Sequence, residues 1–300
     1  MKQNKIKIIG NLLTVLSVIF LLSFFTKLDI DMQIFTDKKI YFVVITGALL
    51  SMVSLMLSAL AWKRTIAFFA DRKIGYLPAA RVYMQANLGK YIPGNMMHFV
   101  ERNLFAGKAG IGQAEAFAGT FIEIAGQLIA AVILGIFLSL KDVLRIAEIL
   151  LSLEYIAAII FLIVIVCVVF RLLYQKKRSL QIICQKIKQP VFWKMLILNE
   201  CLYMTVLFFM SVLMCVIVCL LSEQSLTINE TGKIMTAYIL AWMAGFVIPG
   251  APGGLGVREF VVIYLMRKSR MQESILLAMV LHRMITVLGD ILGYVWGKVR

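Results

Sequence analysis

The stretch Ile-Pro-Gly-Ala-Pro-Gly-Gly-Leu-Gly-Val-Arg-Glu at residues 248–259 interrupts a long apolar segment, 234–266, with two prolines and four glycines. Proline removes a backbone donor, so a regular helix ends at such a stretch. As a helix, residues 234–248 would measure about 22 Å, which is short of the roughly 30 Å hydrocarbon core of a membrane. Interrupted helices at that depth need protein or a wet cavity around the freed backbone. The stretch therefore predicts a re-entrant hairpin within a membrane protein.

The composition of the whole chain agrees with this prediction. Of the 300 residues, 61% are apolar and only 16% are charged, a balance that no soluble domain of this size needs. The net charge of +15 could suggest nucleic acid, but no soluble basic domain exists to bind it. In a chain this apolar, basic residues are expected beside anionic lipid, so the expected partner is the membrane and not nucleic acid.

Six apolar runs are long enough to cross the membrane, which takes about 20 residues of helix. They cover residues 8–25, 41–62, 116–140, 155–174, 195–221 and 275–296. Helices satisfy their own backbone groups in lipid, so we expect an all-α integral membrane protein. The predicted fold is one transmembrane domain, 1–300, with about six full spans and two re-entrant broken-helix hairpins, or about eight hydrophobic segments.

The second hairpin is predicted from an earlier segment, 77–107, which resembles 234–266. It reads Ile-Pro-Gly at residues 92–94, and Arg102 follows the isoleucine by ten residues, as Arg258 does in the later segment. In both segments a short apolar stretch, a basic turn, a Gln and a charged span come next. The shared order predicts an internal repeat.

The repeats would cover about 1–140 and 153–300. Each contains two spans, a hairpin and a third span, so each crosses the membrane an odd number of times. The second repeat would therefore lie upside down relative to the first. Inverted repeats are the architecture of many secondary transporters, which bind their substrates near the midplane where broken helices meet.

The distribution of Lys and Arg predicts that both termini lie in the cytoplasm, since basic residues collect in cytoplasmic loops. Bases concentrate in the stretches 2–7, 63–81 and 171–194. Fewer bases and more acids occur near residues 29–39, 141–154 and 222–230. One cluster, Arg267, Lys268 and Arg270, falls outside in this scheme. The expected location is the inner cell membrane, crossed several times.

The two Pro-Gly breaks favour an anion site where they meet. A half-helix that starts after a break presents unpaired N–H groups and a partial positive charge. Arg102 and Arg258 would add guanidinium groups, which bind phosphate through two oxygens. The expected substrate-binding residues are Lys90, Asn95, Arg102, Glu123, Gly253, Gly254, Arg258 and Arg283. Structural or gating roles are expected for Pro93, Gly94, Glu101, Pro249, Gly250, Glu259 and Asp290.

An alternative interpretation of the arginines stays open. Arg102 and Arg258 could pair with the adjacent acids Glu101 and Glu259, only to neutralise buried charge. Two polar stripes at helical spacing must face the bundle interior or a cavity. They comprise Thr120, Glu123 and Gln127 in one span and Arg283, Thr286 and Asp290 in another. A pair between Glu123 and Arg283 is one hypothesis, and His98 and His282 are either packing residues or proton relays.

Sets of residues typical of other chemistry are missing from the sequence. The glycine-rich stretch lacks the Gly-Lys-Ser/Thr of a nucleotide-binding loop, and no Ser-His-Asp order or metal-ligand cluster occurs. The five cysteines form no Cys-x-x-Cys motif. We therefore expect no cofactor, no metal and no enzymatic activity.

The motif GKYIPG at residues 89–94, followed by Glu101-Arg102, and the motif PGAPGGLGVRE at residues 249–259 resemble the lysylphosphatidylglycerol synthase transmembrane-region family, also described as flippase-like domain proteins. The resemblance covers nearly the whole chain. It implies translocation of lipid, since that region of larger members is thought to move aminoacylated phosphatidylglycerol between leaflets. This chain ends soon after its last span, so the cytosolic synthase domain is not expected.

The resulting hypothesis is translocation of an anionic, phosphate-containing lipid or lipid-linked glycan in bacterial envelope biogenesis. The expected partner is a phospholipid or a polyprenyl-phosphate-linked lipid. Two alternatives stay open. The protein could be a membrane-embedded lipid head-group transferase, or it could be a non-transporting scaffold for envelope-synthesis enzymes.

Overall fold

The computed structural model describes residues 38–91, 97–108, 111–150, 178–247, 254, 256–267 and 269–299, and each regular element among them is helical. Four helices are long and apolar enough to cross a membrane. They are α2 (Lys38–Ala70), α5 (Gln113–Leu150), α8 (Pro190–Ser222) and α11 (Gln272–Lys298). These helices contain the predicted runs 41–62, 116–140, 195–221 and 275–296. The predicted spans 8–25 and 155–174 lie outside the described residues.

Local sequence sets where these helices begin and end. Proline at the first position of α8 fits a helix start, where its missing N–H has no partner in any case. Helix α5 is kinked at Ser139, whose backbone is extended (φ −160°, ψ 88°). The Ser139 hydroxyl donates a hydrogen bond to Asp142 (2.6 Å), at the start of the continuing helix. The kink falls at the predicted end of the span, residue 140.

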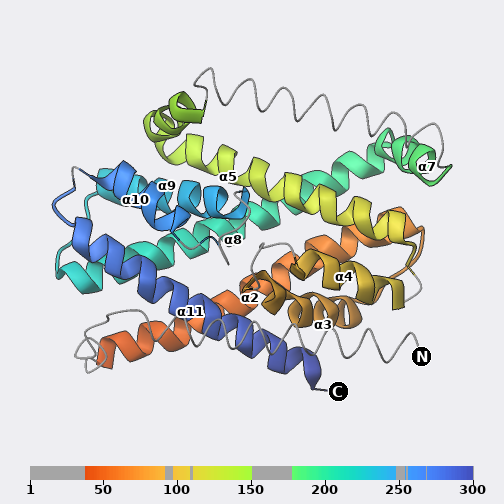
Figure 1. Cartoon of the computed structure of the whole chain (residues 1–300), viewed down its shortest axis with the longest axis horizontal. Coiled ribbons are helices and arrows are strands. Elements are labelled where there is room, and N and C mark those ends of the chain that lie inside the picture. The colour runs from red at the N-terminus through yellow and green to blue at the C-terminus, as the bar shows by residue number, and fades with distance from the viewer. Residues whose placement is uncertain are drawn as a thin grey trace.

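The two interrupted segments form separate helices. The earlier one contains α3 (Tyr76–Asn87), the 3₁₀ helix η2 (Leu88–Tyr91) and α4 (Met97–Lys108), and the later one contains α9 (Ile228–Val247) and α10 (Val257–Met266). At 10–12 residues, α3, α4 and α10 are about 15–18 Å long, too short to cross a bilayer. Figure 1 shows α3 and α4 toward one end of the long helices and α10 toward the other.

Helix α9 starts at Ile228, six residues before the predicted segment 234–266. Its 20 residues measure about 30 Å, so the first half of this segment is longer than the 22 Å expected and matches the thickness of the hydrocarbon core. A reciprocal cap explains the earlier start. The Thr227 backbone N–H donates to the Glu230 carboxylate (2.9 Å), and the Glu230 N–H donates to the Thr227 hydroxyl (3.3 Å). Such a capping box satisfies two backbone donors that the first helical turn leaves free.

The two halves of the chain pack in the same pattern. Within the first half α2 contacts α3 and α5, and α3 and α5 both contact α4. Within the second half α8 contacts α9 and α11, and α9 and α11 both contact α10. Across the halves, α2 packs on α11 as α5 packs on α8, and α3 packs on α11 as α9 packs on α5. Exchanging the halves leaves this set of contacts unchanged.

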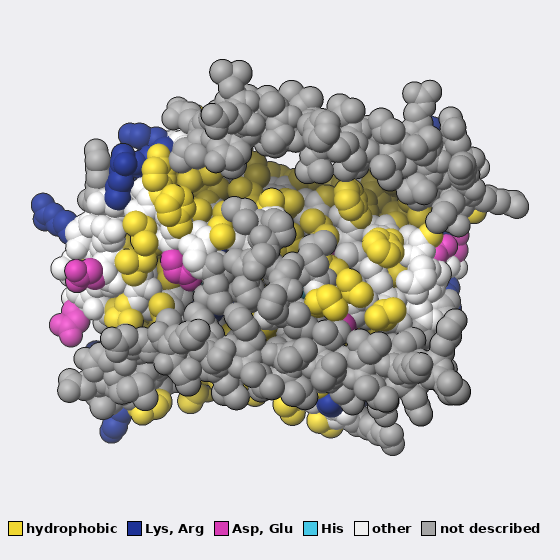
Figure 2. Space-filling model, viewed as in Figure 1, with side chains coloured by type: hydrophobic (Ala, Val, Ile, Leu, Met, Phe, Trp, Pro, Cys, Tyr) yellow, Lys and Arg dark blue, Asp and Glu magenta, His cyan; other side chains and the backbone are white. Residues whose placement is uncertain are grey.

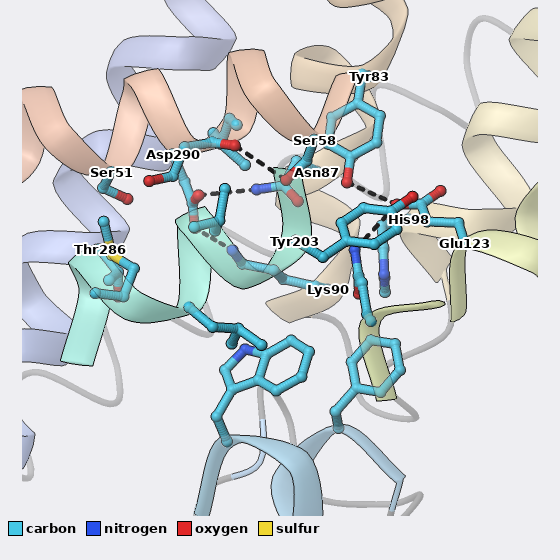
Figure 3. Close-up of a pocket in the computed structure, with 18 of the residues that line it drawn as sticks. Ser51, Ser58, Tyr83, Asn87, Lys90, His98, Glu123, Tyr203, Thr286 and Asp290 are labelled. Carbon is cyan, nitrogen blue, oxygen red and sulfur yellow. Dashed lines mark hydrogen bonds and ion pairs between the residues drawn. The ribbon is translucent and has the colours of Figure 1, made fainter. Parts of the chain in front are cut away.

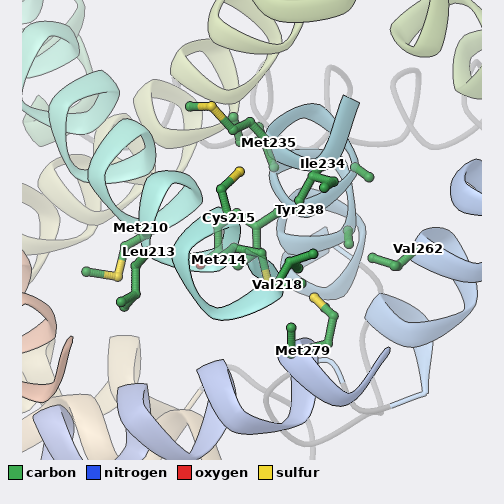
Figure 4. Close-up of a cluster of buried hydrophobic side chains, with 14 of the residues drawn as sticks. Met210, Leu213, Met214, Cys215, Val218, Ile234, Met235, Tyr238, Val262 and Met279 are labelled. Atoms are coloured by element: carbon green, nitrogen blue, oxygen red, sulfur yellow. The ribbon is translucent and has the colours of Figure 1, made fainter. Parts of the chain in front are cut away.

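Hydrophobic side chains fill the bundle and cover its sides. The largest cluster of buried residues forms where α8, α9, α10 and α11 meet, and Figure 4 shows its methionines among branched side chains. Figure 2 shows hydrophobic side chains across the middle of one face and Lys and Arg mostly at its edges. Exposed Phe42, Phe121 and Phe137 are typical of a lipid-facing surface.

Contacts at each end of the bundle bring basic segments together. The Lys186 ammonium of α7 (Arg178–Ile187) donates to the carbonyl of Phe69 at the end of α2 and pairs with Asp71, both at 2.6 Å. At the other end, Arg145 and Arg267 both lie over the Tyr264 ring. The predicted cytoplasmic stretches 63–81 and 171–194 therefore meet at one end. Arg267 lies at the other end beside Arg145, which belongs to residues 141–150, a stretch that was predicted as a loop but continues α5 beyond its kink.

Helices α2 and α11 cross in Figure 1 and approach closely at small residues. A Cβ atom on Gly289 would lie 2.5 Å from the Ser51 Cβ and 2.8 Å from the Ala48 carbonyl oxygen. Gly47 and Gly293 make similar approaches to Ile285 and Leu55. Small residues at such positions let helix backbones pack closely, which drives association where lipid replaces water.

Gly289→Ala is expected to destabilise the protein by about 1–3 kcal/mol, because the added methyl group meets the Ser51 Cβ and the Ala48 carbonyl oxygen, which cannot move away without a shift of the α2 backbone. Thermal unfolding in detergent measures the effect. Gly135→Ala is the matched control, since its methyl group would meet only the ends of two side chains, Val143 at 3.2 Å and Leu240 at 4.0 Å. Equal stability of Gly289→Ala and the wild-type protein would contradict the close packing of α2 on α11.

Candidate functional site

A cavity of about 180 Å³ lies at the centre of the described bundle. Its lining comes from all four long helices and from both interrupted segments, through α3, η2, α4, α9 and α10. Figure 3 shows polar side chains from these elements converging on the cavity. Polar groups within a membrane bundle are costly to bury and generally mark a functional site.

The first charged cluster in the cavity centres on Glu123 of α5. Arg102 of α4 donates from one guanidinium nitrogen to both Glu123 oxygens, at 2.7 and 2.9 Å. The Tyr83 hydroxyl (2.7 Å) and the Gln127 amide (3.3 Å) donate to the same carboxylate. Glu123 is fully buried and Arg102 is 2% exposed. The guanidinium carbon also lies 4.1 Å from the centre of the Tyr83 ring, so aromatic faces share in screening its charge.

The second charged cluster centres on Asp290 of α11, which is 1% exposed. Lys90 of η2 pairs with Asp290 at 2.6 Å, and the Asn87 amide donates to its other oxygen at 2.8 Å. The Tyr91 hydroxyl donates a third hydrogen bond to the carboxylate. Residues 87, 90 and 91 share one side of the helical path from α3 into η2, which aims all three donors at α11. The side chain of Lys90 remains 27% exposed, so Lys90 is more accessible than Arg102 of the first cluster.

Arg258 of α10 lies in the cavity wall against two glycines. A Cβ atom on Gly245 or on Gly254 would stand 2.8 Å from the Arg258 Nε, so only glycine leaves room for the guanidinium group. Gly254 also has φ +79°, a conformation that glycine adopts without strain. The buried Nε of Arg258 has no hydrogen-bond partner among the residues described. Buried donors normally have partners, so this nitrogen is an exception among the described cavity residues.

The three charge pairings considered as alternatives in the sequence do not occur among the described residues. Arg102 pairs with Glu123 rather than with Glu101, because consecutive residues on a helix point to different faces. The hypothesis that Glu123 pairs with Arg283 also fails, since both Glu123 oxygens bind Arg102. Arg283 lies 3.7 Å from Glu259 of α10 instead. Glu259 is thereby engaged with α11 and not with the adjacent Arg258.

Most of the described residues that were singled out in the sequence line the cavity. Its lining includes Lys90, Arg102, Glu123, Gln127, Arg258, Arg283, Thr286 and Asp290. Thr120 lies behind this lining and donates to Asn103 at 3.0 Å. Gly254 borders Arg258, and Glu101 is buried beside Arg102. Pro93, Gly94, Asn95, Pro249, Gly250 and Gly253 lie outside the described residues.

The histidines differ in their surroundings. His282 is buried, contacts the Met210 carbonyl oxygen at 3.1 Å and lies against the Tyr238 ring. His98 lines the cavity, is buried, and has an Nδ1 atom without a hydrogen-bond partner in the described chain. The packing interpretation therefore suits His282 better than His98.

Several cavity residues were missed in the sequence. They are Ser51, Ser54, Ser58, Tyr83, Asn87, Tyr91, Tyr203 and Trp242. The serines follow one face of α2 at a spacing of three and four residues, a stripe that could have been recognised inside an apolar run. Tyrosines offer no comparable pattern, because they occur on lipid-facing and buried surfaces alike.

The lining carries more positive than negative charge. Its Lys and Arg residues are Lys90, Arg102, Arg258 and Arg283, and its acids are Glu123 and Asp290. Arg283 pairs with Glu259 from outside the lining, so the lining and its ion pairs hold one cation more than carboxylates, in a bundle interior where uncompensated charge is costly. An anion would complete the balance. Within the described residues no group of three or more His, Cys, Asp or Glu could hold a metal ion.

Comparison with known proteins gives one match. Residues 8–293 match the family model for the lysylphosphatidylglycerol synthase TM region. No curated protein and no solved structure matches the chain.

Proposed function

The chain belongs to the lysylphosphatidylglycerol synthase transmembrane-region family, and from this premise we propose that it translocates an anionic, phosphate-containing lipid or lipid-linked glycan in bacterial envelope biogenesis. The observation that carries the proposal is the surplus of Lys and Arg in the central cavity. A phosphate group would supply the missing negative charge, and arginine suits it because its planar fork can bind two oxygens.

The cations of the cavity have different roles in this proposal. Arg258, with its unpartnered Nε, and the partly exposed Lys90 contact the phosphate. Arg283 adds charge from α11 beside Arg258. Arg102 and Glu123 form an ion pair and act as a clasp between α4 and α5. A transferase would need a carboxylate that is free to accept a proton. Glu123 and Asp290, the two acids of the described lining, each already bind several donors. This arrangement favours transport over group transfer.

The architecture in the proposal is an inverted repeat, about 1–140 and 153–300, with a re-entrant hairpin in each half. It is supported by the contact pattern, which is unchanged when the halves are exchanged, and by the placement of α4 and α10 toward opposite ends of the bundle (Figure 1). Two hairpins that enter from opposite faces would direct the N-terminal ends of α4 and α10 toward one midplane site. Helix N-termini favour anions there.

The proposed orientation places both termini in the cytoplasm of the inner cell membrane. The contact of Lys186 with the end of α2 supports it, since two base-rich stretches then share one side. Impermeant thiol labelling of Lys188→Cys and Ser269→Cys in a cysteine-free background tests this orientation. Labelling of Lys188→Cys from outside intact cells would contradict it.

Reconstitution into liposomes tests the function. Purified protein is expected to move tail-labelled phosphatidylglycerol or a tail-labelled polyprenyl phosphate from the inner to the outer leaflet, where dithionite quenches the label. Protein-free liposomes and liposomes with heat-unfolded protein are the controls. Failure to move either lipid, with and without an ion gradient, would contradict the proposal.

A further inference from the structure

We infer that the head group this cavity accepts is a phosphodiester bearing one small neutral polyol, such as glycerol or a single sugar, and that it excludes head groups with an ammonium group. The inference rests on the proposed function and specifies the substrate of the same cavity. The inferred substrate therefore differs from lysylphosphatidylglycerol, the lipid in the family's name, whose lysyl group carries ammonium groups.

Exclusion of ammonium groups follows from the state of the two acids. Glu123 accepts hydrogen bonds from Tyr83, Arg102 and Gln127. Asp290 accepts from Asn87 and Tyr91 and pairs with Lys90. In the lining as described, each carboxylate oxygen is therefore engaged. An entering ammonium group would lack an acidic partner and would face a surplus of fixed cations, so its desolvation would go uncompensated.

Binding of hydroxyl groups follows from the serine stripe on α2. Ser54 and Ser58 are each 8% exposed and donate to the backbone carbonyls of Leu50 and Ser54, both at 2.9 Å. This local bonding is usual for serine in a helix and leaves the lone pairs of the hydroxyl free to accept. Figure 3 shows Ser51 and Ser58 on α2 beside the cavity. The hydroxyls of a polyol would donate to these oxygens.

A second observation points to a ligand in the same place. The Tyr203 hydroxyl is buried, lines the cavity and has no hydrogen-bond partner among the described residues. Tyr203 is only 3% exposed, so water at the protein surface does not satisfy this hydroxyl. Buried polar atoms normally have partners, and a ligand hydroxyl or phosphate oxygen would supply one. The half-buried Trp242 gives the cavity an apolar wall suited to the carbon face of a polyol.

The size of the cavity limits the polyol. The cavity volume of about 180 Å³ is close to that of an engineered protein cavity of about 150 Å³ that binds benzene. A phosphate with glycerol or one sugar is of this order, whereas an oligosaccharide is much larger. The acyl or polyprenyl chains would remain outside the cavity, among the apolar side chains of the bundle surface.

Liposomes containing the purified protein and one of five tail-labelled lipids test the inference. The probes are phosphatidylglycerol, phosphatidic acid, phosphatidylethanolamine, lysylphosphatidylglycerol and a polyprenyl phosphate bearing one sugar. Phosphatidylglycerol or the sugar-bearing lipid is expected to move about tenfold faster than the others. Phosphatidic acid lacks one or two hydrogen bonds of the polyol, and the other two lipids bring an unpaired ammonium charge into the cavity. Whichever of phosphatidylglycerol and the sugar-bearing lipid moves faster identifies the source of the polyol phosphate.

Two variants connect the preference to the residues. Ser54→Ala combined with Ser58→Ala is expected to slow phosphatidylglycerol about tenfold and to leave phosphatidic acid unchanged, because only polyol contacts are lost. Tyr203→Phe tests the second contact in the same way. Thr46→Ala is the matched control, since Thr46 lies on the same helix, bonds to the Phe42 carbonyl (2.7 Å) and faces outward.

The outcomes separate the inference from the proposed function. Movement of phosphatidylethanolamine or lysylphosphatidylglycerol as fast as phosphatidylglycerol would overturn the exclusion of ammonium groups. Equal rates for phosphatidic acid and phosphatidylglycerol, or a loss of both in the serine variant, would overturn the polyol contact. Movement of none of the five lipids by the wild-type protein would instead count against translocation itself.

Discussion

Glu123→Ala is expected to lower the free energy of unfolding by about 3–5 kcal/mol, the effect of removing one partner from a buried ion pair. The variant leaves the Arg102 guanidinium group 2% exposed and without its carboxylate. It also removes the acceptor for the Tyr83 hydroxyl. Unfolding of the purified protein in detergent, followed by heat or denaturant, measures the loss.

A double variant separates the pair from its individual charges. Glu123→Met with Arg102→Met leaves no uncompensated charge and is expected to recover at least half of the stability that Glu123→Ala loses. Glu273→Ala, which removes an exposed acid from the first turn of α11, serves as the control for loss of a carboxylate. A Glu123→Ala protein as stable as the wild type would show that the pair is not a clasp.

Arg258→Gln is expected to slow lipid translocation roughly 10- to 100-fold, the loss of one charge-assisted hydrogen bond to phosphate. Stability should change little, because the substitution removes a cation from a positively charged lining and breaks no ion pair seen in the described residues. The leaflet assay in liposomes measures the rate, and unfolding in detergent measures the stability. Arg258→Lys retains the charge without the planar fork, so an intermediate rate is expected.

Arg267→Gln is the matched control for Arg258→Gln. Arg267 follows α10 directly, is exposed and lies over the Tyr264 ring outside the cavity. Its loss removes the same charge from the same segment and should leave translocation at the wild-type rate. Equal rates for Arg258→Gln and the wild-type protein would contradict phosphate binding at Arg258, and a loss in both variants would indicate an effect of net charge alone.

The sequence predicts those parts of the fold that depend on local chemistry. Long apolar runs identify the four described spans, since length and hydropathy alone decide whether a helix can cross a bilayer. Proline and glycine identify the two interrupted segments. The start of α9 was misplaced by six residues because the Thr227–Glu230 cap lies in a polar stretch that was assigned to a loop.

The cavity was less predictable because its contacts join residues far apart in the chain. The polar stripes through Glu123 and Asp290 predict buried faces, but they do not say which donors reach them. Asn87 meets Asp290 across 203 positions of sequence. Arg102 selects Glu123 over its neighbour Glu101 because α4 turns one face toward α5. Such choices depend on how the helices pack, which no local pattern encodes.

The glycine contacts between α2 and α11 constrain how the protein can open to either leaflet. Gly289 of α11 lies against Ser51 of α2, so these two helices, one from each half of the chain, are packed closely together. Helices α5 and α8 make a similar join, where a Cβ atom on Gly126 would stand 2.9 Å from the Tyr203 ring. A rotation of one half of the chain against the other would break both the α2–α11 contact and the α5–α8 contact. If the protein opens alternately to the two leaflets, we therefore expect α2 to move together with α11 and α5 to move together with α8. Each moving unit would then contain one helix from each half of the chain.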